Sequence, residues 1–236
     1  MAETPRYAHL VTLLFLGCGF VTLLCLVIAL VAAVGRARIV AKFAVGGAAF
    51  TAIGYATLLF GVALASGNQT LPPGSWKYFC EADCHIAYSI ESVQEASTLG
   101  QENKPLTAHG RFIVVRLKTW FDEKSIAPFR GNSPLTPDPR TVKLVDDAGR
   151  YYSPAPPAVS IRNDSSTSLT TPLRPGESYV TTLVFDLPTD ARNPRLLVSD
   201  SEPITKLLID HENSPLHGKI YLALGAGSLN SLNTNQ

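Results

Sequence analysis

The chain begins with two long, uncharged apolar runs, Leu10–Val34 and Phe43–Ala65, separated by a short basic link. A helix of about 20 residues spans the hydrocarbon core of a bilayer, so each run is long enough to cross it. The first run also exceeds the ~7–15-residue apolar region of a signal peptide. The sequence therefore predicts a transmembrane hairpin with helices at about residues 10–34 and 43–65 and a loop over residues 35–42.

Basic residues are distributed unevenly around the two runs. The link carries Arg36, Arg38 and Lys42, whereas the stretch after the second run has only Lys77. Because Lys and Arg concentrate in cytoplasmic loops, we expect a cytoplasmic link and an outward-facing C-terminal part. This predicts a two-pass protein of the plasma (inner) membrane whose soluble domain lies on the outer or periplasmic face. As an alternative, Ala63–Ala65 resembles a signal-peptidase site, where cleavage would release the domain.

Small residues recur every seven positions in both runs and so lie on one stripe of each helix. Such residues let membrane helices approach closely. Because neither run contains His, Asp or Glu, we interpret the cysteines of the stripe as packing residues. An antiparallel hairpin with its turn near Ile39–Val40 predicts the pairs Cys18–Gly61, Cys25–Gly54 and Ala32–Gly47.

Composition changes sharply after the second run. All prolines except Pro5 lie beyond residue 70, and acidic and basic residues nearly balance there. A nucleic-acid-binding surface would need a basic stripe, which the sequence does not show. We expect four regions, namely a hairpin at 1–66, a membrane-exit linker at 67–84, an extracytoplasmic domain at 85–226 and a flexible tail at 227–236.

The outer domain shows the alternation of apolar and polar residues that is typical of strands. In His85–Val93, Ile86, Tyr88 and Ile90 share one face. In Arg111–Phe121 the predicted core face consists of Ile113, Val115, Leu117, Thr119 and Phe121. Further strands are expected at Thr141–Val145, Arg150–Tyr152, Ser178–Leu187, Arg195–Val198, Ile204–Ile209 and Lys219–Leu224. Short strands in sequence without a long helix predict a β-sandwich.

Four segments in order carry a resemblance: SIESVQEA, GRFIVVRLKTWF, VKLVDDAGRYY and LRPGESYVTTLVFDLP. Over about Cys84–Val198 the chain resembles a bacterial immunoglobulin-like (telokin-like) domain of unknown function, found in membrane-anchored extracytoplasmic proteins. The resemblance implies an all-β immunoglobulin-like sandwich after the two-helix transmembrane hairpin. It implies no catalytic residue, and the Pro-rich connections 122–140 and 153–172 are longer than the family's usual loops.

The densest group of reactive side chains is Cys80-Glu81-Ala82-Asp83-Cys84-His85. In an oxidising compartment, a Cys80–Cys84 disulfide is the favoured interpretation. The alternative is a copper or zinc site formed by Cys80, Cys84 and His85, because thiolate and imidazole ligands suit these metals. Reversibly redox-active thiols are a third interpretation. If the disulfide forms, His85 is expected to be a solvated side chain.

The remaining histidines give weaker signals. His211 and His217, beside Asp210 and Glu212, could form a carboxylate–imidazole metal site, but surface loop residues are the better interpretation. His109 is expected to be solvated. No serine lies in a Gly-x-Ser-x-Gly context, and no phosphate-binding glycine loop is present.

These patterns favour a non-catalytic binding or interaction module of the cell envelope. Its expected partners are the lipid bilayer and another envelope protein, and no cofactor is expected. The alternative is a redox or copper/zinc-handling protein that uses Cys80, Cys84 and His85. Transport is disfavoured, because two helices without intramembrane charges offer no polar pathway.

Overall fold

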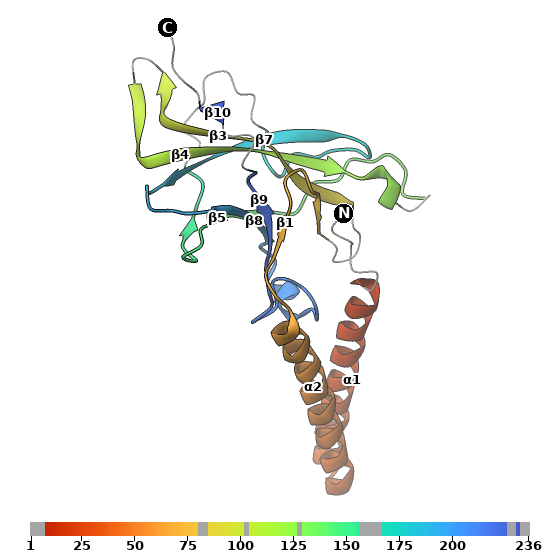
Figure 1. Ribbon diagram of the computed structural model, residues 1–236. Coiled ribbons are helices and arrows are strands. Elements are labelled where there is room, and N and C mark those ends of the chain that lie inside the picture. The colour runs from red at the N-terminus through yellow and green to blue at the C-terminus, as the bar shows by residue number, and fades with distance from the viewer. Residues whose placement is uncertain are drawn as a thin grey trace. The chain divides into compact units, whose positions relative to one another are not determined.

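The computed structural model describes residues 8–79, 85–101, 104–126, 129–155, 167–225 and 230–231 (Figure 1). They form two compact units. One unit contains the two N-terminal helices together with the later segment Glu202–Lys219. The other contains Asn68–Ser201 and the strands from Ile220 onward, and it is all-β. The sequence placed residues 202–219 in the sandwich, and the structure instead groups them with the helices.

Helices α1 (Ala8–Val34) and α2 (Arg38–Ala65) run side by side (Figure 1). Both are long and apolar enough to cross a membrane. Large apolar side chains such as Phe20, Phe43 and Phe50 are mostly exposed on them. A helix that is apolar on all sides suits a lipid environment better than water.

The turn between the helices is tighter than the sequence predicted. After α1, Arg36 adopts a left-handed conformation at φ 59°, and the Ala37 N–H donates to the Ala32 carbonyl at 2.8 Å. α2 then begins at Arg38 rather than near Phe43. Arginine and lysine are good helix formers, so Arg38 and Lys42 belong to α2 instead of a loop, and Arg36 stays in the turn.

The earlier start of α2 changes the packing register of the hairpin. A Cβ built on Gly47 would lie 3.4 Å from Cys25 Sγ, whereas Cβ atoms on Gly54 and Gly61 would meet no atom within 4 Å. The predicted pairs of Cys25 with Gly54 and of Cys18 with Gly61 are therefore wrong. Gly47 packs against Cys25 instead of Ala32, because moving the turn toward the N-terminus moves every pairing with it.

The all-β unit consists of two sheets that lie one above the other in Figure 1. One sheet has the order β10-β3-β4-β7, with β2 also paired to β3, and the other has the order β1-β9-β8-β5-β6. The strands are β1 (Gln69–Leu71), β2 (Lys77–Tyr78), β3 (Ile86–Gln101), β4 (Lys104–Phe121), β5 (Arg140–Val145), β6 (Tyr151–Tyr152), β7 (Ser178–Leu187), β8 (Arg195–Asp200), β9 (Ile220–Ala223) and β10 (Asn230–Ser231).

The core lies between the two sheets, and the predicted core face of β4 is confirmed. All five residues of that face are at most 2% exposed: Ile113, Val115, Leu117, Thr119 and Phe121. They pack with Phe185 of β7 and with Leu144 and Leu196 of the other sheet. Strand β7 has the predicted bounds, whereas β3 and β4 extend beyond the predicted strands toward their common turn.

A bulge in β3 changes which side chains face the core. The pairing with β4 shifts between Ile90 and Ser92. Before the bulge, Ile86 and Tyr88 are buried as predicted, and Ile90 is only partly buried. After the bulge, Val93 is fully buried. One extra residue reverses the alternation, because successive strand residues point to opposite faces.

The β3–β4 hairpin continues past its neighbour β7. Pairing between β4 and β7 begins at Arg111 and Leu187, whereas the hairpin continues to Gln101 and Lys104 (Figure 1). Gly110 lies where the hairpin leaves β7. A Cβ on Gly110 would lie 2.5 Å from the Leu187 carbonyl oxygen and 2.6 Å from the Thr189 nitrogen, so the close backbone approach requires glycine at this position.

The predicted strand at Ile204–Ile209 is wrong, because Pro203–Leu207 forms the short 3-10 helix η2. Pro203 fixes φ and has no N–H for a sheet ladder. The Thr205 hydroxyl donates to the Glu202 carbonyl at 2.7 Å, and the Leu208 N–H donates to Thr205 O at 3.3 Å. These local bonds use the polar groups that a strand would give to a neighbour.

The two long connections differ in how much of them the structure describes. The connection over 122–140 contains the 3-10 helix η1 (Glu123–Ser125) and a bridge from Leu135 to Leu173. Most of the other connection, residues 156–166, lies outside the described residues.

Candidate functional site

A buried cationic cluster at one end of the sandwich is the most unusual chemical feature of the β unit. Lys77 lies on the edge strand β2 opposite Tyr88, so its side chain points into the core. It is only 2% exposed. Its ammonium donates to the Val198 carbonyl at 2.6 Å and to the Ile220 carbonyl at 2.9 Å. One lysine therefore links the sheet of β3 and β4 to two strands of the opposite sheet.

The position of these two carbonyls follows from the local topology. On β8, Arg195 and Leu196 are the residues that pair with β9. Val198 and Ile220 therefore lie beyond the end of that ladder. A buried carbonyl without a donor costs free energy. The Lys77 ammonium occupies this opening and donates to both strands.

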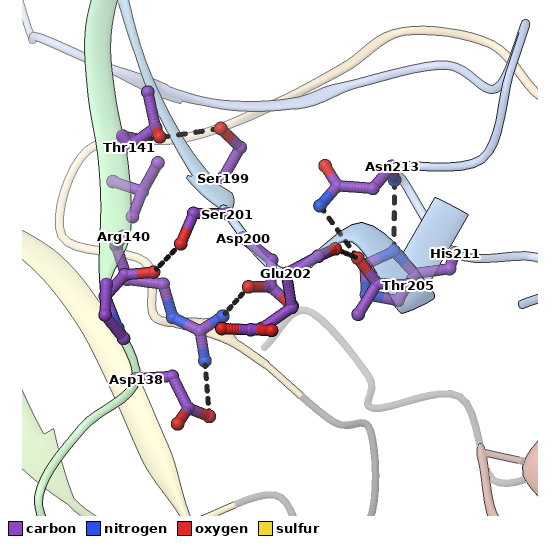
Figure 2. A network of polar contacts seen from close by, with 12 residues as sticks. Asp138, Arg140, Thr141, Ser199, Asp200, Ser201, Glu202, Thr205, His211 and Asn213 are labelled. Atoms are coloured by element: carbon purple, nitrogen blue, oxygen red, sulfur yellow. Dashed lines mark hydrogen bonds and ion pairs between the residues drawn. The ribbon is translucent and has the colours of Figure 1, made fainter. Parts of the chain in front are cut away.

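Arg140 at the start of β5 is the second buried cation of the cluster. Its guanidinium lies 3.1 Å from an Asp200 carboxylate oxygen on β8, and both side chains are almost completely buried. The more exposed Asp138 lies 3.9 Å away (Figure 2). Two further hydrogen bonds join the same parts of the chain. Ser199 Oγ donates to Thr141 O, and Ser201 Oγ donates to Pro139 O (Figure 2).

The aromatic ring of Phe79 contacts both cations. Its centroid is 4.1 Å from the Arg140 guanidinium carbon and 5.1 Å from Lys77 Nζ. A cation over a ring face is stabilised most when both partners are desolvated. Phe79 also contacts Tyr88 edge-on at 5.6 Å, so the cluster continues directly into the apolar core.

Sequence reasoning did not identify Lys77, Arg140 or Asp200 as special residues. A signal for Lys77 exists in the alternation of Trp76-Lys77-Tyr78-Phe79, which places a lysine and a phenylalanine on the same inward face. No comparable signal exists for Arg140 and Asp200, because their pairing depends on the β5–β8 register. The cluster holds the two sheets together through contacts between groups of the fold itself.

A second group surrounds His85, the described member of the predicted metal site. His85 is buried, not solvated as expected, and its ring stacks on Phe121 at 5.5 Å between centroids. Its Nδ1 lies 2.9 Å from Ser125 Oγ, and that hydroxyl donates to the Asp122 carbonyl at 2.8 Å. Cys80 and Cys84 lie outside the described residues, so their predicted disulfide and their alternative role as metal ligands remain predictions.

Tyr78 and Asp122 form a further contact beside His85. The Tyr78 hydroxyl donates to the Asp122 carboxylate at 2.9 Å. Burial and this hydrogen bond, in that order, raise the pKa of Tyr78 to about 12. The hydroxyl thus stays protonated and ties the end of β2 to the end of β4.

An ion-pair group fixes the turn between β5 and β6. Asp146 accepts from the Arg150 side chain at 2.7 Å and from the Tyr152 hydroxyl at 2.9 Å, and Arg150 also binds Asp190 at 2.8 Å. Burial alone would raise the pKa of Asp146, but the bonds from Arg150 and Tyr152 outweigh burial and lower it. The same arginine lowers the pKa of Asp190.

The other predicted histidines are surface or loop residues. His109 Nδ1 lies 2.5 Å from Asp186, and the His109 side chain is almost fully exposed. His217 Nε2 lies 3.3 Å from Asp210. Among the residues that the structure describes, no three His, Cys, Asp or Glu side chains are grouped so that they could hold a metal ion.

Comparisons with known proteins yielded one structural similarity. No protein-family model matches the chain, and no curated protein matches it. A secreted protein from Mycobacterium tuberculosis, MPT63, is similar in structure, with a TM-score of 0.42 and 9% sequence identity. The similarity covers 66% of this chain and 97% of that protein.

Proposed function

We propose that this protein is a membrane-anchored, extracytoplasmic, immunoglobulin-like module that binds another envelope protein without catalysing a reaction. The observation that carries the proposal is the β3–β4 hairpin arm, residues 97–101 and 104–109. Among the described residues, Thr98–Gln101 pair only with Lys104–Thr107 of the same arm. These pairs lie beyond Arg111 and Leu187, the last pair of β4 and β7. Strands without neighbours are sites at which partner chains add by main-chain hydrogen bonding.

The strand order supports the immunoglobulin-like assignment. The sequential strands β3, β4 and β7 form one sheet in the order β3-β4-β7, and β5, β8 and β9 form the other in the order β9-β8-β5. This is the arrangement of strands A, B and E opposite C, F and G in immunoglobulin sandwiches. The non-catalytic character is supported by the buried ionic groups, because Lys77 and Arg140 contact groups of the fold itself.

Within the part of the chain that the structure describes, the arm has one edge without a neighbouring strand and one blunted edge. Pro105 lies on the β4 side and has no N–H to donate, which disfavours strand addition there. Leu106 on the same strand is 44% exposed, although leucines in sandwiches are usually covered. We therefore expect a partner to pair along the β3 edge near Thr98 and Gly100 and to cover Leu106.

Site-specific photo-crosslinking in the native membrane tests this proposal. p-Benzoylphenylalanine in place of Leu106 should give one discrete adduct with a second protein, and the same group in place of Lys143 on β5 should not. Replacing Thr98 by proline removes one N–H of the β3 edge and should abolish the Leu106 adduct without lowering the amount of folded protein. Equal adducts at Leu106 and Lys143 would contradict the proposal.

The outward orientation rests on the basic link of the hairpin. The link places Arg36 in the turn between α1 and α2 and Arg38 and Lys42 at the start of α2, and such residues concentrate on the cytoplasmic side. A cysteine in place of Arg38 should resist an impermeant thiol reagent in intact cells, and one in place of Lys143 should react. The opposite labelling pattern would reverse the orientation.

A second candidate function is copper or zinc handling by Cys80, Cys84 and His85. The observation that favours it is the contact of His85 Nδ1 with Ser125 Oγ at 2.9 Å, because metal-binding imidazoles are usually held by such a partner. Thiol counting and metal analysis of the purified full chain separate the two candidates. Stoichiometric metal that is lost after His85→Ala and weakened after Ser125→Ala would favour metal handling, and a metal-free protein with two thiols oxidised would favour the disulfide.

A further inference from the structure

The segment Glu202–Lys219 is the one part of the chain after the hairpin that belongs to the helical unit. Two hydrogen bonds tie it to α2. The Tyr55 hydroxyl donates to the Leu207 carbonyl at 2.5 Å, and the Gly218 N–H donates to Ser66 Oγ at 2.7 Å. The segment therefore extends along the last part of the helix, from the level of Ser66 to that of Tyr55.

The depth of this segment follows from helix geometry. α2 has 28 residues, which at ~1.5 Å per residue is a length of ~42 Å. The hydrocarbon core of a bilayer is only ~30 Å thick. If the apolar part of α2 starts at Phe43, just after Lys42, the core ends near Val62 and Tyr55 lies ~10 Å inside it. The Leu207 carbonyl is then at the depth of the outer acyl chains.

The side chains of the segment match such a location. Ile204 and Leu207 are 57% and 48% exposed, so large apolar groups of η2 have no full cover from protein. The part of α2 between Tyr55 and Ser66, to which the segment is bonded, also exposes large apolar side chains such as Leu58 and Phe60. The Leu207 carbonyl, which water would not reach in a bilayer, is hydrogen-bonded by Tyr55.

The polar residues of the segment cluster at its other end. Asp210 binds His217, and the next residue, Gly218, bonds to Ser66 just beyond the end of α2. The turn between them is fixed by Asn213, whose amide donates to Thr205 Oγ1 at 3.1 Å and whose backbone N–H donates to His211 Nδ1 at 3.0 Å (Figure 2). The segment thus has an apolar end beside Tyr55 and a polar end at the level of the lipid headgroups.

We infer that Glu202–Lys219 is a membrane-surface element whose η2 side chains, Ile204 and Leu207, insert among the lipid acyl chains beside α2. The inference rests on the proposed membrane anchoring by α1 and α2. The partner is the lipid of the bilayer that the two helices cross, because η2 is bonded to α2 through Leu207 and Tyr55 and both elements expose large apolar side chains. The element follows β8 and precedes β9 in the chain.

Photo-crosslinking to lipid in nanodiscs tests the inference on the full-length protein. p-Benzoylphenylalanine in place of Ile204 should form lipid adducts, detected by mass, several-fold more often than the same group in place of Asp210. Phe50, which is 82% exposed on α2, is the positive control. Adducts at Phe50 but none at Ile204 would overturn the inference and leave the anchoring intact. Absence of adducts at Phe50 would overturn both.

Hydrogen exchange provides a second measurement that does not depend on the bulky probe. Replacing Ile204 and Leu207 by serine should speed amide exchange of the segment in nanodiscs several-fold and leave β8 unchanged. If these side chains faced water, polar replacements would change nothing. Equal exchange rates in the wild type and the double variant would therefore also overturn the inference.

Discussion

The ammonium of Lys77 lies 2.6 Å from the carbonyl oxygen of Val198, and this hydrogen bond connects the two sheets of the sandwich. A lysine that points inward from an edge strand is costly unless its charge is satisfied. Here the ladder of β8 and β9 ends early, and the carbonyls of Val198 and Ile220 accept hydrogen bonds from the Lys77 ammonium. The inward charge also makes strand β2 a poor template for pairing with other chains.

Replacing Lys77 by methionine should destabilise the sandwich by about 2–3 kcal/mol, because a charged donor is lost and buried carbonyls are left without it. Denaturant unfolding of the full chain in detergent micelles would measure the change. Tryptophan fluorescence is a suitable signal, since Trp76 next to Lys77 contacts Trp120 at 5.1 Å. The matched control is Lys143→Met on β5, where the lysine is only partly buried, and it should change stability by at most ~0.5 kcal/mol. Equal effects of the two variants would show that the Lys77 bonds contribute little.

Replacing Gly110 by alanine should cost about 3 kcal/mol, because the added methyl group overlaps with backbone atoms that cannot rotate away. These atoms belong to Leu187, Pro188 and Thr189 at the end of β7. Gly67→Ala is the control, since a Cβ at Gly67 would meet no atom within 4 Å. The free energies of unfolding of both variants should be compared with that of the wild type. An unchanged midpoint for Gly110→Ala would mean that the hairpin arm moves away from β7 at no cost.

The Asp146 ion-pair group should make stability depend on acid pH. The pKa of Asp146 is lower in the folded protein than its usual value of 3.8, so the unfolded chain takes up the proton first as pH falls. Its contribution to stability is therefore complete above about pH 5 and is lost as the pH falls through 3.8 toward the lower folded value. Asp146→Asn should lower the unfolding midpoint at pH 7 and reduce the difference between pH 7 and pH 3. Identical pH profiles of the wild type and Asp146→Asn would contradict this expectation.

Replacing Gly47 by leucine should disrupt the helical hairpin more than replacing Gly54 by leucine. Gly47 is the glycine of α2 whose Cβ would contact Cys25, and overpacking there typically costs ~1–3 kcal/mol. Gly54 has open space, so a leucine there is accommodated. Unfolding in detergent, followed by loss of helical circular dichroism, distinguishes the two variants. A larger effect at Gly54 would restore the register expected from the glycine spacing.

Much of the fold could be predicted because it depends on local patterns. The period-2 alternation of Arg111–Phe121 identified the core face of β4, and the turn residues before Ser178 marked the start of β7. The candidate site was less accessible to such reasoning. Lys77, Arg140 and Asp200 are separated widely in sequence and meet only because β2, β5 and β8 converge.

The sequence by itself determined the two apolar helices, the all-β character of the following unit and the burial pattern of its longest strands, because hydrophobic period and turn chemistry act over a few residues. Only the tertiary structure decided the helix register around Cys25 and Gly47, the assignment of Glu202–Lys219 to the helical unit, and the buried charges of Lys77 and Arg140. These features depend on where the chain turns and on which distant carbonyls lie within reach of a buried donor, and no short sequence window contains that information.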